Sequence, residues 1–114
     1  MLRGEIRVVN LEPVVGSEAD KRRPAVIVSN DDANATAAML GRGVVTIVPI
    51  TSSTERVLPF QVLLPAEMTG LSRDSKAQAE QVRSVAVQSG RVIGRLPTEF
   101  MALLDAALRL HLAL

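Results

Sequence analysis

The feature that most constrains the fold is a succession of short runs of β-branched and aliphatic residues, separated by polar segments. These runs predict strands at residues 5–11, 24–29, 43–51, 60–64, 81–87 and 91–95. Residues 81–87 alternate with period two, which is typical of a half-buried strand. Pro49 lies near the end of its run, so we expect an edge strand or a strand exit there.

Two segments predict helices instead. Residues 30–40 open with capping residues and continue Ala-rich, so a short helical turn is expected. The adjacent Asp31 and Asp32 point apart, which favours a helix-capping role over a metal site. From Pro97 the apolar spacing becomes helical. The predicted apolar face comprises Phe100, Leu103, Leu104, Ala107, Leu108 and Leu112. The pattern favours a mostly β domain, with an antiparallel sheet or open barrel covered by a terminal helix.

Length and composition exclude several classes of protein. A chain of 114 residues forms one domain over 1–114, and its 47% hydrophobic content is too high for disorder. The absence of Cys excludes disulfide scaffolds, thiolate metal sites and Cys nucleophiles. The net charge of +1 excludes a strongly basic coat, so any nucleic-acid contact must come from a local patch.

Histidine catalysis, phosphate binding by a Gly-rich loop and base stacking on aromatic residues are excluded because the residues that they need are absent or too few. The only histidine, His111, is expected at the surface or helix end, so one subunit offers neither a His pair for acid–base catalysis nor a His-rich metal site. Gly41-Arg42-Gly43 is too short for a phosphate loop. The two Phe residues lie in apolar patterns and form no base-stacking platform. No targeting or membrane segment is visible, so we expect a cytoplasmic protein. We also expect no metal and no cofactor.

Four short motifs follow one another along the chain. They are Arg23-Pro24, Pro49-Ile50-Thr51, Pro59-Phe60-Gln61-Val62 and Glu80-Gln81-Val82-Arg83-Ser84. This ordered set resembles the MazF/PemK toxins of type II toxin–antitoxin systems over nearly the whole chain. The resemblance implies a small SH3-like or CcdB-like open barrel of antiparallel strands with a C-terminal helix. It also implies a dimeric, sequence-selective, metal-independent endoribonuclease that inhibits translation and growth, with messenger, ribosomal and transfer RNA all open as targets.

The resemblance assigns an active-site pair, Arg23 and Thr51. Metal-free RNA cleavage through the 2′-OH needs a base, positive charge at the phosphorus and a proton source for the leaving oxygen. Arg23 suits charge stabilisation because its planar fork holds two phosphate oxygens and stays protonated. The Thr51 hydroxyl can orient the 2′-OH or a phosphate oxygen. Glu18 aligns with the family's loop glutamate, either as the base or as a residue that orders the loop, and a solvent-facing role is the alternative.

The same motifs suggest further RNA contacts. Lys21, Arg22 and Arg83 are expected to contact backbone phosphates, which raises affinity without reading sequence. Ser52, Ser53 and Gln81 are candidate substrate contacts, with ordinary loop and strand roles as alternatives. The chain departs from the family pattern at Arg7-Val8-Val9, where an aromatic is common, and at Ala86, where an Asp is common. These departures bear on target recognition more than on the fold.

Two other functions share the predicted fold. One is a non-catalytic toxin that binds and poisons DNA gyrase, which would not need the Arg23 and Thr51 pair. The other is an inert sheet protein that binds a peptide. For the ribonuclease we expect a cognate antitoxin whose acidic, partly disordered tail covers Arg23 and its loop, together with a symmetric homodimer.

Overall fold

A computed structural model describes residues 1–11, 22–87 and 90–114. The elements in chain order are β1 (Glu5–Asn10), β2 (Arg22–Ile27), α1 (Asp31–Leu40), β3 (Val44–Thr51), β4 (Gln61–Leu64), α2 (Ala66–Thr69), β5 (Ser75–Gln78), the 3₁₀ turn η1 (Ala79–Gln81), β6 (Arg83–Ala86), β7 (Val92–Arg95) and α3 (Thr98–Leu112). In these residues no helix is both long enough and apolar enough to span a bilayer.

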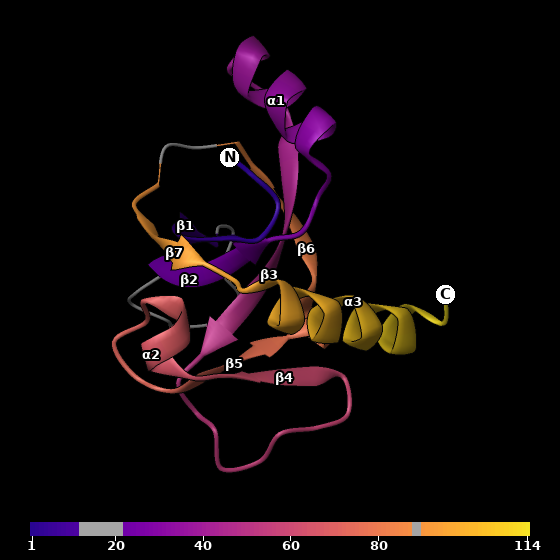
Figure 1. Cartoon of the computed structure of the whole chain (residues 1–114). Coiled ribbons are helices and arrows are strands. Elements are labelled where there is room, and N and C mark those ends of the chain that lie inside the picture. Colours follow the sequence, from indigo (N-terminus) through magenta and orange to yellow (C-terminus); the bar gives the residue numbers. More distant parts are fainter. Residues whose placement is uncertain (12–21, 88–89) are drawn as a thin grey trace.

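The strands in this part of the chain form one curled antiparallel sheet. Their order is β4-β5-β3-β2-β1-β7, and β6 pairs with the first half of β3. Figure 1 shows α3 lying across the lower part of the sheet, where it contacts β4 and η1. The mostly β fold with an open, curled half-barrel and a C-terminal helix is therefore confirmed.

Strand β3 is a central strand, so of the two expectations for Pro49 the edge strand is wrong, and the strand exit agrees with the end of β3 at Thr51. β3 pairs with β2 on one side and with β6 and then β5 on the other. Pro49 pairs with Ala25 of β2. On the other side it falls between Ile47, where pairing with β6 ends, and Ile50, where pairing with β5 begins. A residue without an N–H is tolerated at this point because β3 is changing partner there.

The core is aliphatic, as the composition requires, and lies on both faces of the sheet. Because successive strand residues point to opposite faces, Val26 packs in one cluster, and Ala25 and Ile27 pack in the other. The first cluster includes Leu104 of α3, and we call this face the α3 side. The second includes Ala37 of α1, and we call this face the α1 side.

The C-terminal helix forms where it was predicted, but its buried face differs from the prediction. Leu104 and Ala107 are buried, and Met101 also packs against the core. Leu103 and Leu112 were expected on the buried face, yet they are 54% and 48% exposed. In Figure 1 the end of α3 projects beyond the sheet, which explains Leu112. Leu103 instead lines an open groove beside β4.

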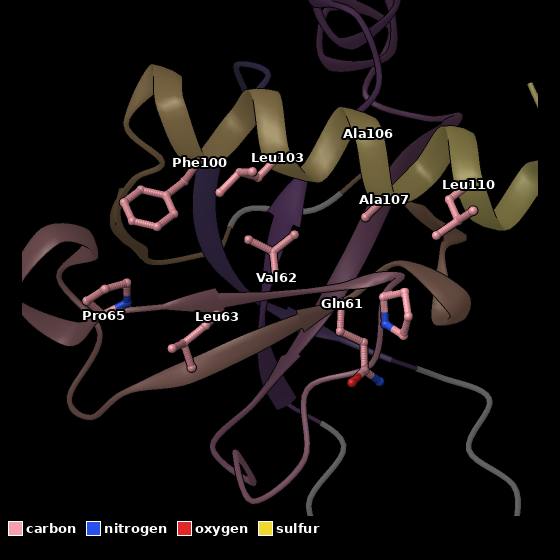
Figure 2. A pocket seen from close by; sticks show the side chains of 10 residues that line it. Gln61, Val62, Leu63, Pro65, Phe100, Leu103, Ala106, Ala107 and Leu110 are labelled. Carbon is pink, nitrogen blue, oxygen red and sulfur yellow. The ribbon is translucent and has the colours of Figure 1, made fainter.

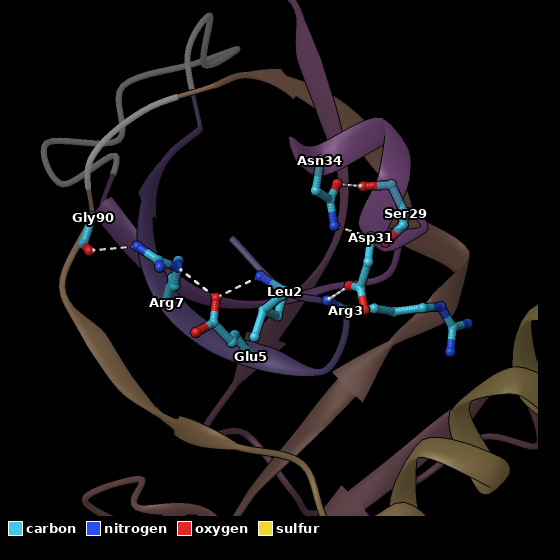
Figure 3. Close-up of polar contacts among 8 residues, drawn as sticks. All are labelled: Leu2, Arg3, Glu5, Arg7, Ser29, Asp31, Asn34 and Gly90. Carbon is cyan, nitrogen blue, oxygen red and sulfur yellow. Dashed lines mark hydrogen bonds and ion pairs between the residues drawn. The ribbon is translucent and has the colours of Figure 1, made fainter. Parts of the chain in front are cut away.

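Helix α1 is a full ten-residue helix rather than a short turn. Its N-cap is Asn30, whose side chain accepts the Ala33 N–H, so the acidic pair lies in the first turn rather than at the cap. Asp31 accepts the backbone N–H of Arg3, and Figure 3 shows this contact joining α1 to the start of the chain. Asn34 is buried and is bonded to Ser29 through both ends of its amide.

A second polar cluster lies at the start of β1. The Glu5 carboxylate accepts the Leu2 N–H at 2.7 Å and the Arg7 Nε at 3.2 Å (Figure 3). Burial on its own raises the pKa of Glu5. The two hydrogen bonds and the positive charges of Arg7 and the chain N-terminus outweigh burial and hold this pKa below its ordinary value.

Two segments differ from the predicted elements. The polar stretch over residues 70–78 contains β5, which lies between β3 and β4. The predicted strand at 81–87 is shorter, because residues 79–81 form η1 and β6 covers only Arg83–Ala86. Within β6 Val85 is buried and its neighbours are not, so the predicted alternation is correct. The short helix α2 was not expected.

Candidate active site

The register of β2 and β3 sets Arg23 opposite Thr51. These antiparallel strands pair Ala25 with Pro49 and Ile27 with Ile47. The paired residues end at Ala25 and Pro49, and Arg23 and Thr51 each lie two residues beyond them, in the positions that the same register aligns. Both are half-buried, and alternation puts them on the α1 side of the sheet. Two residues far apart in sequence are thus neighbours at one end of the sheet.

The Thr51 hydroxyl is held by the chain that follows it. Its Oγ1 accepts the backbone N–H of Ser53 at 3.2 Å. A hydroxyl has one proton and two lone pairs, so this bond leaves the proton and one lone pair for a ligand. The hydroxyl is therefore oriented by the protein and still able to donate to a phosphate oxygen.

The same row contains a lysine that the sequence did not indicate. Lys76 of β5 pairs directly with Thr51 on the side opposite β2. Its side chain is only 9% exposed, and its Nζ donates to the carbonyl oxygen of Arg56 at 2.5 Å. The surrounding segment, Ser75–Gln78, has no apolar alternation, and nothing in its sequence marked a strand beside β3. Arg23, Thr51 and Lys76 thus form one row across three strands, which we call the cation–hydroxyl row.

The remaining predicted contacts lie at different distances from this row. Ser52 and Ser53 directly follow Thr51 and are exposed. Arg22 is at the same end of β2, but alternation points it to the other face. Arg83 pairs with Ile47, four residues and about 13 Å back along β3, on the α1 side.

One further predicted contact falls outside the row, and two predicted residues lie outside the described part of the chain. Gln81 is exposed in η1. Glu18 and Lys21 lie outside the described residues, so the predicted base and one predicted phosphate contact keep the status of predictions.

Two of the family motifs contact each other through their polar residues. Gln61 donates from Nε2 to Glu80 Oε2 at 2.6 Å, and its Oε1 accepts the Leu58 N–H at 3.0 Å. The Phe60 carbonyl also accepts the Ala79 N–H. These bonds join the start of β4 to η1 and fix the end of the loop that begins after Thr51.

A groove between β4 and α3 is chemically different from the row (Figure 2). Its volume is about 470 Å³. Its lining is Pro59, Gln61, Val62, Leu63, Pro65, Phe100, Leu103, Ala106, Ala107 and Leu110. A lining without a charged side chain offers nothing to pair with a phosphodiester, so the cation–hydroxyl row is the better candidate for such chemistry.

Acidic and imidazole groups do not gather in the part of the chain that the structure describes. No three of its Asp, Glu and His residues are placed to share a metal ion. His111 is exposed near the end of α3, as expected, with its ring centroid 5.8 Å from that of Phe60. Among the described residues, the row therefore offers a guanidinium and a hydroxyl to a substrate, and the Lys76 ammonium is bonded to a backbone carbonyl.

A small curled antiparallel half-barrel with a C-terminal helix is the fold of the solved MazF toxins. The model of one family, described as PemK-like, MazF-like toxin of type II toxin–antitoxin system, matches residues 2–112. The chain belongs to this PemK/MazF family.

Named relatives agree with this assignment. The chain is 60% identical over 115 residues to endoribonuclease MazF9 of Mycobacterium tuberculosis. The alignment covers 100% of this chain and 98% of the relative. It resembles the crystal structure of MazF from Deinococcus radiodurans with a TM-score of 0.74 and 27% identity, over 100% of this chain and 97% of that one. A mycobacterial endoribonuclease in complex with its cognate antitoxin shares the fold, with a TM-score of 0.74 and 23% identity over 100% and 96% of the two chains. The gyrase-binding alternative receives no support from these relatives.

Proposed function

We propose that this chain is the toxin of a type II toxin–antitoxin pair and acts as an endoribonuclease on single-stranded RNA. Family membership and the endoribonuclease names of its relatives support this activity. The single observation that carries the site is the register that aligns Arg23 with Thr51 on neighbouring strands. RNA cleavage in the cytoplasm would stop translation and growth.

The proposed reaction is an internal transfer at phosphorus that needs no metal. The 2′-oxygen attacks the adjacent phosphorus, the bond to the 5′-oxygen breaks, and the products are a 2′,3′-cyclic phosphate and a 5′-OH. The proton of the 2′-OH passes to a base, for which Glu18 is the candidate, and the leaving oxygen takes up a proton. Negative charge on the phosphoryl oxygens increases as the fifth bond forms.

Arg23 and Thr51 would stabilise that charge in different ways. The Arg23 guanidinium stays protonated and can donate two parallel hydrogen bonds to phosphoryl oxygens. The Thr51 hydroxyl, already fixed by the Ser53 N–H, can donate its proton to a third oxygen or orient the 2′-OH. Donors aimed at developing charge commonly supply the largest catalytic contribution, and one such donor is worth about 10²–10³ in kcat.

We further propose two protein partners. The first is a cognate antitoxin with an acidic, partly disordered tail that covers Arg23 by charge complementarity. A relative solved in complex with its antitoxin supports the antitoxin itself. The second is another copy of this chain, which would cover part of the apolar surface that α3 exposes. Antitoxin binding that is insensitive to every substitution at residues 18–23 would contradict the first proposal.

The activity is tested by incubating the purified chain with a long single-stranded RNA in the presence of EDTA. We expect a small set of specific cuts with cyclic phosphate and 5′-OH ends, and a loss of at least 100-fold in Arg23→Ala and Thr51→Ala. The matched controls are Arg42→Ala and Thr36→Ala, because both residues are exposed and distant from the end of β3. Cleavage that disappears with EDTA, or that survives both active-site substitutions, would refute the proposed mechanism.

A further inference from the structure

The lysine of the cation–hydroxyl row is unusual because its charged side chain is buried within the sheet. Lys76 lies at one end of the row, with Thr51 of β3 on one side and Leu63 of β4 on the other. Lysine is rarely this buried unless its ammonium has a partner. Here the partner is the backbone carbonyl of Arg56.

The position of Arg56 in the chain explains what this bond does. Both β3 and β4 are antiparallel to β5, so they run parallel to each other with β5 between them. Residues 52–60, which we call the crossover loop, must therefore return along the length of β5 before β4 can begin. Figure 1 shows this loop as the wide arc below β4. The Lys76 ammonium thus ties the sheet to the middle of the loop.

The crossover loop is also bonded to Thr51. Its second residue, Ser53, donates its N–H to Thr51 Oγ1, and Leu58 near its far end donates to Gln61. Between these two points the Lys76–Arg56 bond is a third tether. Only two residues separate Ser53 from Arg56, so movement at the middle tether is transmitted to the N–H that holds the hydroxyl.

We propose that Lys76 is a positioning residue for RNA cleavage, which anchors the crossover loop so that the Thr51 hydroxyl is held in its reactive orientation. The inference rests on the proposed function of Arg23 and Thr51. Lys76 acts through the loop, because its ammonium donates to the Arg56 carbonyl oxygen and not to a group of Arg23 or Thr51. Strand spacing also keeps the backbones of Lys76 and Arg23 about 10 Å apart, so the lysine does not duplicate the guanidinium.

The test distinguishes a positioning role of Lys76 from a folding defect and from the loss of one positive charge. Lys76→Met keeps the buried stem and removes the ammonium, whereas Lys76→Arg keeps a cationic donor. Arg42→Met removes one exposed cation at the opposite end of β3 and serves as the charge control. Single-site RNA oligonucleotides, designed around a cut mapped with the unmodified protein, allow kcat and KM to be measured separately.

We expect Lys76→Met to lower kcat at least tenfold with KM within threefold, because a displaced hydroxyl loses transition-state contact rather than ground-state binding. Lys76→Arg should recover at least half of the lost activity on a logarithmic scale, and Arg42→Met should stay within twofold. In a Thr51→Ala background, Lys76→Met should add less than threefold, because the group that it positions is already absent. If Lys76→Met fails to fold, Ser53→Pro removes the N–H that holds Thr51 Oγ1 and should lower kcat at least as much, with Ser53→Ala as the control for loss of the Ser53 hydroxyl.

The possible failures are distinct from one another. A kcat within threefold of the unmodified protein in folded Lys76→Met, alongside inactive Arg23→Ala, would overturn the role of Lys76 and leave the proposed function standing. A rise in KM alone would also overturn it, because the loop would then bind substrate without positioning Thr51. An unmodified chain that cuts no RNA would overturn both.

Discussion

The contact that a side chain would make at Gly94 predicts a strongly destabilising substitution. A Cβ added at Gly94 of β7 would lie 2.2 Å from the carbonyl oxygen of Thr69 at the end of α2, which is more than 1 Å inside an ordinary contact. The neighbouring atoms are backbone, so no flexible side chain can move away. Overpacking of this kind costs about 3 kcal/mol, at the upper end of its usual range. In a domain of this size that is a fall of about 12 °C in Tm.

The matched control is Gly41→Ala at the end of α1. Gly41 has φ +65°, and nothing lies within 4 Å of its added Cβ. Its cost is therefore conformational only, about 1 kcal/mol or about 4 °C in Tm. Urea unfolding followed by circular dichroism, at one protein concentration, would measure both free energies of unfolding. A Gly94→Ala loss no larger than that of Gly41→Ala would refute the steric reasoning and the close packing of α2 on β7.

Three further predictions follow from buried or paired groups. Leu104→Ala in the core should lower the free energy of unfolding by about 2–5 kcal/mol in urea denaturation, because it leaves a cavity, and a loss below 1 kcal/mol would mean that α3 repacks. Asn34→Ala should cost about 1–3 kcal/mol in the same assay, because Ser29 loses both of its buried amide partners. Glu5→Gln should lower Tm near neutral pH, but not well below the ordinary Glu pKa of 4.5. The folded pKa is depressed, so the stabilisation by Glu5 is present above 4.5 and disappears as pH falls through the folded value. A Tm difference between the Glu5 variants that is constant from pH 3 to pH 7 would contradict the last prediction.

Most strands could be predicted because buried strands are rich in β-branched and aliphatic residues, which the sequence shows directly. β3 and the core of β2 are continuous apolar runs, and the helical spacing after Pro97 marks α3. β5 could not be predicted, because Lys76 and Ser75 are polar residues that become buried through pairing between β3 and β4. Tertiary pairing, rather than local propensity, makes this segment a strand.

The site was only partly visible in the sequence for the same reason. Arg23 and Thr51 could be named from motif resemblance, and their alignment across β2 and β3 is a property of the register. Lys76 belongs to no motif and becomes relevant only once β5 is known to lie beside Thr51. The exposure of Leu103 depended on how far α3 stands from β4, which helical periodicity does not encode.

Helix α1 offers a place for a reporter that leaves the reaction undisturbed. Only Asn34 and Ala37 of the helix are buried, and Met39 is 80% exposed. α1 leads into the start of β3, whereas Thr51 ends that strand, and Figure 1 shows the helix standing away from the rest of the molecule. Because the chain contains no cysteine, Met39→Cys would introduce a single thiol for a fluorophore. Binding of the proposed antitoxin and RNA could then be followed by fluorescence from the end of β3 opposite Thr51.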